Sequence, residues 1–513
     1  MKILDCTLRD GGYYTNWDFE RTLVDDYIES FNHLPVDFLE IGYRSVRKLG
    51  TYLGEYFYLP LGTMQRIREQ SKKQLVVIIN EKDVQPEQVK TMLQPCVGII
   101  DMVRIAVNPA RMKNGLLLAE QVKAMGFITC INAMYMSSWK EQADFLKLLP
   151  EMDHLADYFY MVDSYGGVYP DDVLSIYELV RNKTSVALGF HGHNNLELAF
   201  MNTLTAVYCG VDIVDATVCG MGRGAGNLRT ELLLAALNSK GQVKFDYNHL
   251  SKVVDGFSKL HERYNWGTNL PYIFSGANSL PQKDVMDWVS KRYYSFNSIM
   301  RALNNQLAVG EERHNLPKFP IDGTPTSEDV LIIGGGASAI MHEEAVKLFL
   351  KSKPQMIVVH ASSKNAMTYK EIANTQIFCL VGNEGLRMEE VFSGDLPLSS
   401  ISVLPPSPRK MGTYIPKNLV QKACELSAID FTPKYLDSHT TVALQTALNL
   451  GATNIYLVGY DGYDSGEVAN KDHELFIENE YLFTEVQKKA VKVTSLTATK
   501  YNSLTQDSIF ALI

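Results

Sequence analysis

The chain has 513 residues, too many for one ordinary hydrophobic core, and this length predicts about two to four domains. Hydrophobic residues make up 46% and charged residues 21%, which is typical of a globular chain and excludes a disordered one. The formal net charge of -9 argues against a general surface for nucleic acid or anionic membranes.

The seven cysteines include no CxxC pair, which predicts reduced thiols in a cytoplasmic protein. The first residues, MKILDCTLRDGG, lack the apolar segment of a signal peptide. No apolar run in the sequence is long enough to span a bilayer, so we expect no membrane partner.

Short segments rich in β-branched and aromatic residues recur along the first part of the chain, with helical segments such as LLLAEQVKAM between them. These predicted strands lie at residues 2–8, 36–42, 75–80, 101–107, 127–133, 157–163, 186–192 and 212–218. Eight strands that alternate with helices predict an α/β fold, a (β/α)8 TIM barrel over residues 1–240.

Polar residues stand at the ends of these predicted strands, where the catalytic groups of a TIM barrel gather. They are Arg9, Asp10, Glu40, Asn80, Arg104, Asn108, Asn132, Asp163, Ser164, His191, His193 and, in the loop GMGRGAGN, Asn227. We expect these side chains to surround one mouth of the barrel.

The segment HGHNN follows the apolar run VALGF at the end of the seventh predicted strand. Residues i and i+2 of a strand point to the same side, so His191 and His193 can direct their imidazole nitrogens at a single point. This pattern is typical of metal ligands, although an HxH pair also occurs by chance and needs a third ligand.

Beyond the barrel, residues 241–322 are predicted to form a helical extension that caps the barrel, flanks it or makes a homo-oligomer contact. The Pro- and Gly-rich segment at residues 314–329 indicates a linker. A smaller Rossmann-like α/β domain is then expected over residues 328–513.

This last domain begins with VLIIGGGASAI, in which Gly334, Gly336 and Ala339 have the G-x-G-x-x-A spacing. Glycines at such a turn let the backbone approach a phosphate group. The next predicted strand ends in His360 and lacks the acidic residue of a dinucleotide site. The motif therefore leaves two alternatives, a nucleotide-type site and a purely structural tight turn.

Three motifs in order, TLRDGG, HGHNN and VDATVCGMGRGAGN, resemble the superfamily of metal-dependent pyruvate aldolases, hydroxymethylglutaryl-CoA lyases and isopropylmalate synthases, and most of all the 4-hydroxy-2-oxovalerate aldolases. The resemblance implies a divalent metal, Mn²⁺ or Mg²⁺, bound by Asp10, His191 and His193, with Asn227 as a further or outer ligand. It implies an aldolase or condensing enzyme that acts on a 2-oxo acid such as pyruvate, with an aldehyde or acyl partner, through a metal-stabilised enolate.

The resemblance also implies roles for other residues of the predicted mouth. Arg9 would support the enolate oxygen, or else close the mouth with a salt bridge. Ser164 would lie near the pyruvate carboxylate, or else be a simple turn hydroxyl. Glu40 would support the site or act as the base, or else pair with Arg44 or Arg104.

One departure from the aldolase pattern concerns the proton carrier. Aldolases of this type have a histidine soon after the RDG motif, whereas this chain has Gly12, Tyr13 and Tyr14. Tyr13 or Tyr14 could exchange a proton, but an unperturbed phenol titrates near pH ~10 and would need activation.

The C-terminal segment looks loosely like the nucleotide-sugar-binding sheet of bacterial sialyltransferase-like proteins, which implies a nucleotide or nucleotide-sugar partner there. Two rival functions for the barrel are a metal-dependent hydrolase and a non-catalytic ligand-binding barrel. A hydrolase of the amidohydrolase type has its HxH on the first strand, whereas this chain has RDG there.

Overall fold

The structure, a computed structural model, describes residues 1–291, 296–307, 316–393, 400–409, 412–463 and 470–513. It contains two compact units, Met1–Met286 and Asp287–Ile513, here called the barrel unit and the sheet unit. The predicted helical extension at 241–322 is divided between them, and its residues 292–295 and 308–315, which include the start of the predicted linker, lie outside the described residues.

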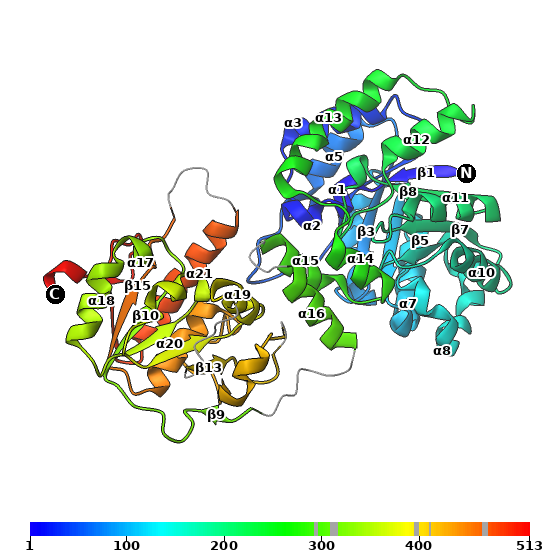
Figure 1. Cartoon of the computed structure of the whole chain (residues 1–513). Helices are drawn as coiled ribbons and strands as arrows, with labels where there is room; N and C mark the ends of the chain where they lie inside the picture. The colour runs from blue at the N-terminus through cyan, green and yellow to red at the C-terminus, as the bar shows by residue number, and fades with distance from the viewer. Residues whose placement is uncertain (292–295, 308–315, 394–399, 410–411, 464–469) are drawn as a thin grey trace. The chain divides into compact units, whose positions relative to one another are not determined.

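The barrel unit contains a closed parallel barrel, as the sequence predicted (Figure 1). Each strand pairs with the next along the chain, and the first pairs with the last. The strands are β1 (Lys2–Asp5), β2 (Phe38–Tyr43), β3 (Gln74–Asn80), β4 (Met102–Val107), β5 (Ile128–Ala133), β6 (Tyr158–Asp163), β7 (Ala187–Gly192) and β8 (Ile213–Ala216).

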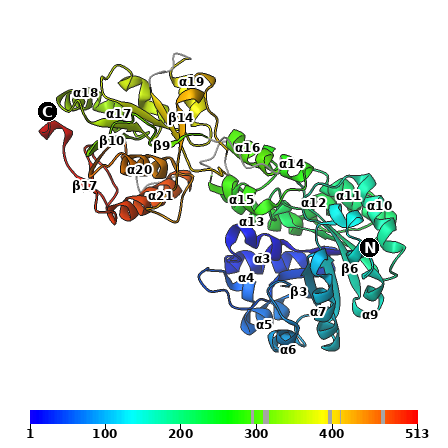
Figure 2. The same ribbon diagram turned by 90° about the horizontal axis from the view of Figure 1, so that it is seen from below.

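Helices surround this barrel, as the two perpendicular views show (Figures 1 and 2). Those that follow the strands are α1 (Thr7–Asp10), α2 (Gly12–Thr15), α3 (Arg21–Phe31), α4 (Glu55–Tyr58), α5 (Leu61–Gln70), α6 (Pro86–Leu93), α7 (Met112–Ala124), α8 (Ala143–Leu146), α9 (Met152–Leu155), α10 (Pro170–Arg181), α11 (Ala199–Cys209) and α12 (Thr230–Ser239). Further along are α13 (Tyr247–Tyr264), α14 (Leu270–Ala277) and α15 (Gln282–Lys291). The buried side chains of α13 belong to the same hydrophobic cluster as those of α3, so α13 is part of the barrel unit.

The two-residue period of the strands builds the interior of the barrel in layers. Phe38, Met102 and Ile213 belong to one small apolar cluster of buried residues. Two residues further along the same strands are Glu40, Arg104 and Asp215, which are also buried. Because residues two apart on a strand share a side, the apolar layer continues into a charged layer towards the carboxyl ends of the strands.

The sheet unit contains an open parallel sheet with the strand order β17-β16-β15-β10-β11-β12-β13-β14-β9. Its strands are β9 (Lys318–Phe319), β10 (Asp329–Ile333), β11 (Ile357–His360), β12 (Gln376–Cys379), β13 (Ile401–Leu404), β14 (Ala423–Leu426), β15 (Asn454–Val458), β16 (Lys492–Ser495) and β17 (Thr505–Gln506). Its helices are α16 (Phe296–Leu307), α17 (Ser338–Met341), α18 (Glu343–Ser352), α19 (Glu384–Val391), α20 (His439–Asn449) and α21 (Asn470–Gln487).

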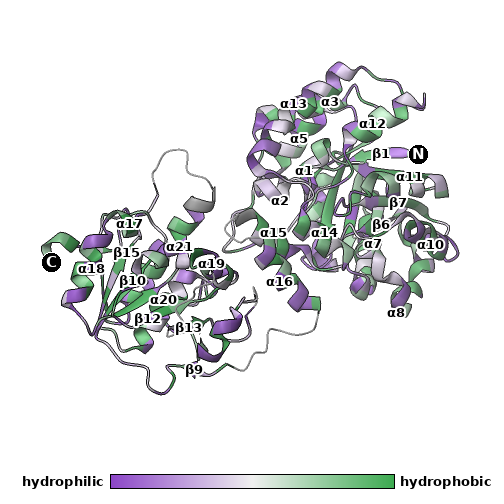
Figure 3. Ribbon diagram, in the orientation of Figure 1, coloured by the Kyte–Doolittle hydropathy of each residue, from purple (hydrophilic) through white to green (hydrophobic). Residues whose placement is uncertain are grey.

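Both faces of this sheet are covered by helices. Val330 and Ile332 of β10 belong to one hydrophobic cluster with side chains of α20 and α21, while Leu331 and Ile333 pack in another with α18. Successive residues of β10 therefore face opposite helical layers, which is why its sequence is continuously apolar (Figure 3). The predicted fold class, a TIM barrel followed by a second α/β domain, is confirmed.

No helix in the described part of the chain combines the length and the apolar character that crossing a bilayer requires.

Candidate metal centre and substrate cavity

Three predicted ligands converge at the mouth of the barrel. Asp10 lies just after β1, while His191 and His193 lie at the end of β7, and all three are buried. One ligand atom from each lies within 4.8 Å of the other two, and Nε2 of His191 is 3.6 Å from Oδ2 of Asp10. Two imidazoles and a carboxylate at this spacing can hold one divalent ion and leave other positions on it open.

Asn227, the fourth predicted ligand, lies beside this group. Its Nδ2 donates a hydrogen bond of 2.5 Å to Oδ2 of Asp10, and its backbone bridges that of His193. Its Oδ1 is buried and has no hydrogen-bond partner among the residues that the structure describes. A buried oxygen that lacks a partner is costly, so this atom fits a further ligand position or a contact to a metal-bound water. The residues present therefore fit a divalent metal.

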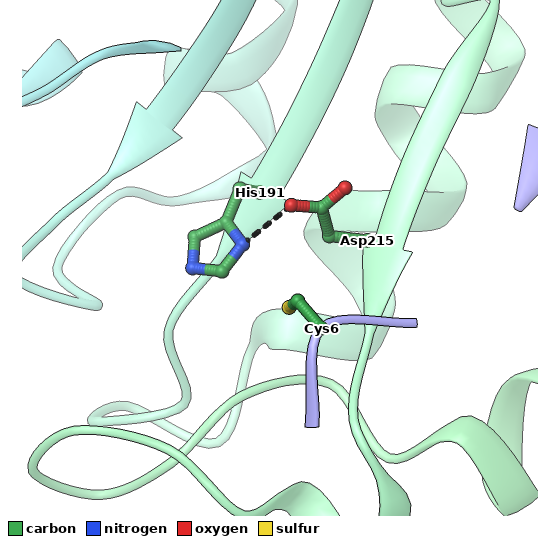
Figure 4. Close-up of side chains that lie close together, drawn as sticks. All are labelled: Cys6, His191 and Asp215. Carbon is green, nitrogen blue, oxygen red and sulfur yellow. Dashed lines mark hydrogen bonds and ion pairs between the residues drawn. The ribbon is translucent and has the colours of Figure 1, made fainter. Parts of the chain in front are cut away.

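His191 is held by a carboxylate on its other side (Figure 4). Its Nδ1 lies 2.8 Å from Oδ2 of Asp215, the residue that β8 places beneath it. A proton on Nδ1 would be donated to Asp215, which leaves the lone pair of Nε2 directed at Asp10 and His193. Asp215 was not among the predicted site residues, because nothing in the sequence shows that β8 brings it to His191.

Cys6, His191 and Asp215 form a second group with ligand spacing (Figure 4). Burial raises the pKa of the Cys6 thiol well above its usual value, so this sulfur stays protonated. Asp215 already contacts both His191 and Arg104. The group of Asp10, His191 and His193 is therefore the better candidate for a metal centre.

A buried ion-pair network lies beneath the candidate ligands. Arg9 donates from Nη1 to Asp10 (2.6 Å) and from Nε to Glu40 (2.7 Å). Arg104 donates to the same Glu40 oxygen (3.2 Å) and to Asp215 (2.6 Å). Of the two partners that the sequence offered for Glu40, Arg104 pairs with it, whereas Arg44 donates to the carbonyl oxygens of Tyr58, Leu59 and Met92.

These charges shift the acid–base behaviour of the ligands. Burial acts to raise the pKa of Asp10, but Arg9, His193 and His191 outweigh it and hold that pKa well below its usual value. Burial, followed by the neighbouring His191, lowers the pKa of His193 to about 3. Near neutral pH the group thus offers an ionised carboxylate and an unprotonated imidazole, the forms that bind metals.

Two tyrosines meet where the aldolase pattern has a histidine. The hydroxyl groups of Tyr13 and Tyr43 are 3.3 Å apart, and both side chains line the cavity at the mouth. Burial, and next the neighbouring Tyr13, raises the pKa of Tyr43 well above its usual value. Tyr14 instead donates to the carbonyl oxygen of Gly224 (2.8 Å). Tyr43, the last residue of β2, was not predicted from the sequence, because nothing there shows that it meets Tyr13.

Ser164 follows β6, and its hydroxyl oxygen accepts a hydrogen bond from the backbone N–H of Tyr135 (2.9 Å). Its carbonyl oxygen accepts one from Nη2 of Arg223 (3.3 Å), a residue of the GMGRGAGN loop that was not predicted. The preceding residue, Asp163, holds the turn by accepting from the backbone N–H of Gly167 (3.1 Å), and burial raises its pKa to about 7.

A cavity of about 280 Å³ joins these groups. Nine residues that the sequence placed at the mouth line it: Arg9, Asp10, Tyr13, Asn80, Asn108, Asn132, Ser164, His191 and His193. Glu40, Arg104, Asp163 and Asn227 are not among the lining residues; Glu40 contacts Arg9, and Asn227 contacts Asp10. The volume suits a molecule of a few carbon atoms.

In the sheet unit, the glycines of the G-x-G-x-x-A turn pack against the loop after β15. A Cβ at Gly334 or at Gly336 would come within 2.6 Å of the carbonyl oxygen of Gly459. Ala339 is fully buried beside the same loop. The close approach that these small residues allow is therefore made by the protein's own backbone.

The anion position of this turn is also filled from within. Asp461 accepts a hydrogen bond from the backbone N–H of Ser338 (3.0 Å) and another from the Ser338 hydroxyl. Its carboxylate thus lies at the start of α17, where a dinucleotide motif would hold phosphate. The neighbouring Gly335 is different, since a Cβ there would lie 3.6 Å from Cδ of Lys364, its nearest atom among the described residues. Gly335 also lines an open cavity of about 710 Å³.

Comparisons with known proteins relate this chain to a family. The family model described as HMGL-like matches residues 110–255. A 4-hydroxy-2-oxovalerate aldolase of Geobacillus genomosp. 3 is 30% identical over 247 residues, which are 47% of this chain and 71% of that protein. An oxaloacetate decarboxylase of Mycobacterium tuberculosis is 28% identical over 250 residues, with coverage of 47% and 71%.

A solved structure titled "the N-terminal domain of a putative aldolase from Bacteroides vulgatus" is 49% identical. It matches with a TM-score of 0.56 and covers 59% of this chain and all of that one.

The barrel and its mouth thus define a TIM-barrel protein with a candidate divalent-metal centre at the carboxyl ends of its strands. With the sequence relationship to the Geobacillus aldolase, the chain belongs to the HMGL-like family.

Proposed function

We propose that the barrel unit is a divalent-metal-dependent aldolase or condensing enzyme that acts on a 2-oxo acid such as pyruvate, with an aldehyde or acyl partner. The observation that carries the proposal is the convergence of Asp10, His191 and His193 beside Oδ1 of Asn227, which no described residue hydrogen-bonds. The nitrogen and oxygen donors suit Mn²⁺ or Mg²⁺. Family members with the name 4-hydroxy-2-oxovalerate aldolase support that activity as the specific form.

A divalent ion in this position would polarise the ketone of the 2-oxo acid and stabilise the negative charge that develops on its oxygen. Arg9 supports the same charge, because its guanidinium is fixed by Asp10 and Glu40 and borders the cavity. Ser164 borders the cavity from the β6 side and is proposed to lie near the carboxylate of the substrate.

Tyr13 is the proposed proton carrier, with Tyr43 as its neighbour in the relay. The two hydroxyl groups are 3.3 Å apart. When Tyr13 gives up its proton, Tyr43 can therefore supply another. Glu40 is less suited to this role, because it lies beneath Arg9 and does not border the cavity. We therefore assign Glu40 to holding Arg9 and Arg104 in place.

Exchange of the methyl protons of pyruvate in D₂O, measured by NMR with and without Mn²⁺, tests the proposal. We expect exchange only with the metal, because enolisation is the step that an aldolase and a condensing enzyme share. Absence of exchange in the full chain with stoichiometric Mn²⁺ would favour the hydrolase or the non-catalytic barrel. Hydrolysis of esters or amides by the same sample would then separate those two.

For the sheet unit we propose binding of a nucleotide or nucleotide-sugar. The observation that favours it is the cavity of about 710 Å³ lined by Gly335 and residues after β15. In the sheet order, β10 lies between β11 and β15. Strands β11 to β14 are added on one side of β10, and strands β15 to β17 are added on the other side. Open α/β sheets bind ligands at the point where the strand order reverses in this way. Because Asp461 fills the glycine turn, we place the ligand on the Gly335 side of the cavity.

Calorimetric titration of the full chain with UDP and CDP tests this second proposal. Binding that weakens in Lys364→Gln, a change of a cavity residue whose Nζ donates to the carbonyl oxygen of Gly335 (3.0 Å), would support it. Absence of binding heat at millimolar concentration would contradict it.

A further inference from the structure

Arg223 differs from the other arginines that border the barrel cavity. Arg9 pairs with Asp10 and Glu40, and Arg111 pairs with Glu81 (2.9 Å). Arg223 has no carboxylate within 4.0 Å among the described residues. Its guanidinium donates to one carbonyl oxygen, that of Ser164 (3.3 Å), and lies 5.9 Å from the centre of the Tyr13 ring.

The position of Arg223 places its charge beside the candidate metal centre. It lies in the loop after β8, four residues before Asn227, and borders the same cavity as Asp10 and His193. A half-buried cation at this place repels a bound divalent ion, unless an anion lies between the two.

A 2-oxo acid supplies such an anion. When its ketone and carboxylate oxygens both face an ion held by Asp10, His191 and His193, its carboxylate lies in the cavity that Arg223 borders. A planar guanidinium suits a carboxylate because two of its N–H groups can donate in parallel. The neighbouring Tyr13 ring limits where the guanidinium can move.

We propose that Arg223 binds the carboxylate of the 2-oxo acid, so that the site selects an α-carboxylate and rejects a neutral ketone of the same shape. This inference rests on the proposed function of the barrel. It makes Arg223 a specificity-determining residue for the donor substrate, and it predicts a larger effect on substrate binding than on the rate at saturation.

The test compares pyruvate with pyruvamide, its neutral analogue, on Mn²⁺-loaded full-length wild type and Arg223→Gln. We expect the substitution to raise the KM of proton exchange for pyruvate roughly ten- to hundredfold, the size of a lost charge-assisted hydrogen bond. The KM for pyruvamide should stay within about twofold of its wild-type value, because this neutral substrate has no carboxylate that could pair with the charge of Arg223. Arg223→Lys should bind pyruvate more tightly than Arg223→Gln but less tightly than the wild type. Lysine keeps the positive charge but lacks the two parallel N–H donors of the guanidinium.

Arg111→Gln is the matched control, because it removes a cation from the rim of the same cavity that Glu81 already neutralises. An equal loss of pyruvate affinity in this control would overturn the inference. The positive charge around the cavity as a whole, and not a contact with Arg223, would then explain the weaker binding of pyruvate. Stoichiometric Mn²⁺ binding and an unchanged melting temperature of Arg223→Gln exclude loss of the metal or of the fold.

Pyruvate binding by calorimetry separates the two proposals. If the wild type exchanges protons but Arg223→Gln binds pyruvate as tightly, the inference is wrong and the proposed function stands. If the wild type binds pyruvate through Arg223 without exchange, the inference stands and the enzymatic proposal is wrong. If the wild type does not bind pyruvate, both are wrong.

Discussion

In the barrel and in the open sheet alike, functional side chains are expected at the carboxyl ends of the parallel strands. The two regions differ in how these strand ends come together. A closed barrel directs all its strand ends at one axis, so Asp10 after β1 meets His191 and His193 after β7. An open sheet spreads its strand ends along an edge, and only strands at the reversal point come together. There Asp461 after β15 meets the turn after β10.

The two regions also differ in what remains unpaired. At the barrel mouth, Oδ1 of Asn227 is buried without a partner and Arg223 has no carboxylate partner among the described residues. At the glycine turn of the sheet unit, the backbone N–H and hydroxyl of Ser338 are both satisfied by Asp461. Unpaired groups indicate a place for a ligand, whereas satisfied groups indicate a finished structural contact.

The largest expected effect comes from breaking the ligand set of the barrel. His191→Ala or His193→Ala should abolish nearly all Mn²⁺ binding and proton exchange, because each removes one of the three converging ligands. Metal content by mass spectrometry and exchange by NMR measure this. His249→Ala, a change of a half-buried histidine that stacks on His33 outside the ligand group, serves as the control. Stoichiometric Mn²⁺ in both site variants would show that the ligand assignment is wrong.

Arg9→Lys should slow proton exchange roughly a hundredfold, because a donor aimed at developing charge is typically worth about 3–4 kcal/mol. Lysine keeps the charge but cannot contact both Asp10 and Glu40 as the guanidinium does. Single-turnover exchange and the melting temperature are measured on one preparation. Arg68→Lys, which alters an ion pair with Asp101 away from the cavity, is the control. A variant that melts early but reacts at the normal rate would make Arg9 purely structural.

In the sheet unit, adjacent glycines should respond differently to the same added methyl group. Gly336→Ala should destabilise this unit by about 1–3 kcal/mol, because its Cβ would lie 2.6 Å from the Gly459 carbonyl oxygen and 2.8 Å from Cγ of Asp461. Gly335→Ala should cost much less, since its nearest neighbour is 3.6 Å away. Urea unfolding measures both. Equal stability of the two variants would mean that the glycine turn is not packed against the β15 loop.

A further prediction is a pH dependence of stability specific to the sheet unit. Burial lowers the pKa of His360 to about 4, whereas an exposed histidine titrates near 6.5. Between these values the unfolded chain takes up a proton that the folded one does not, so stability falls as the pH drops from about 6.5 to about 4, by up to ~1.4 kcal/mol per pH unit. His360→Gln should flatten this slope of the unfolding free energy. An unchanged slope would show that His360 is not its source.

The sequence predicted those parts of the molecule that depend on local pattern. The apolar segments became the barrel strands, and the i, i+2 spacing of His191 and His193 placed both rings at one point. Part of the charged layer inside the barrel was also predicted, because Glu40 and Arg104 lie on predicted strands in which side chains alternate between the two sides. Their pairing with each other was one of the alternatives, and it is present.

The missed residues depend on contacts between distant segments. Asp215 meets His191 only because β7 and β8 are neighbours in register, and Tyr43 meets Tyr13 only because β2 lies beside the turn after β1. A phenol at the end of a strand and an arginine in a glycine-rich loop carry no signal of their own. The role of Asp461 was equally hidden, because 123 residues separate it from Ser338.

The carboxylate of Asp461 gives the sheet unit a built-in imitation of a bound phosphate. Glycines with this spacing indicate that another group lies very close to the backbone of the turn. That group can be a bound ligand or, as here, another segment of the same protein. In this chain one acidic residue in the loop after the neighbouring strand β15 occupies the turn from within. A search for cofactor sites by glycine spacing would therefore discriminate better if it also asked which side chain the neighbouring strand delivers to the turn.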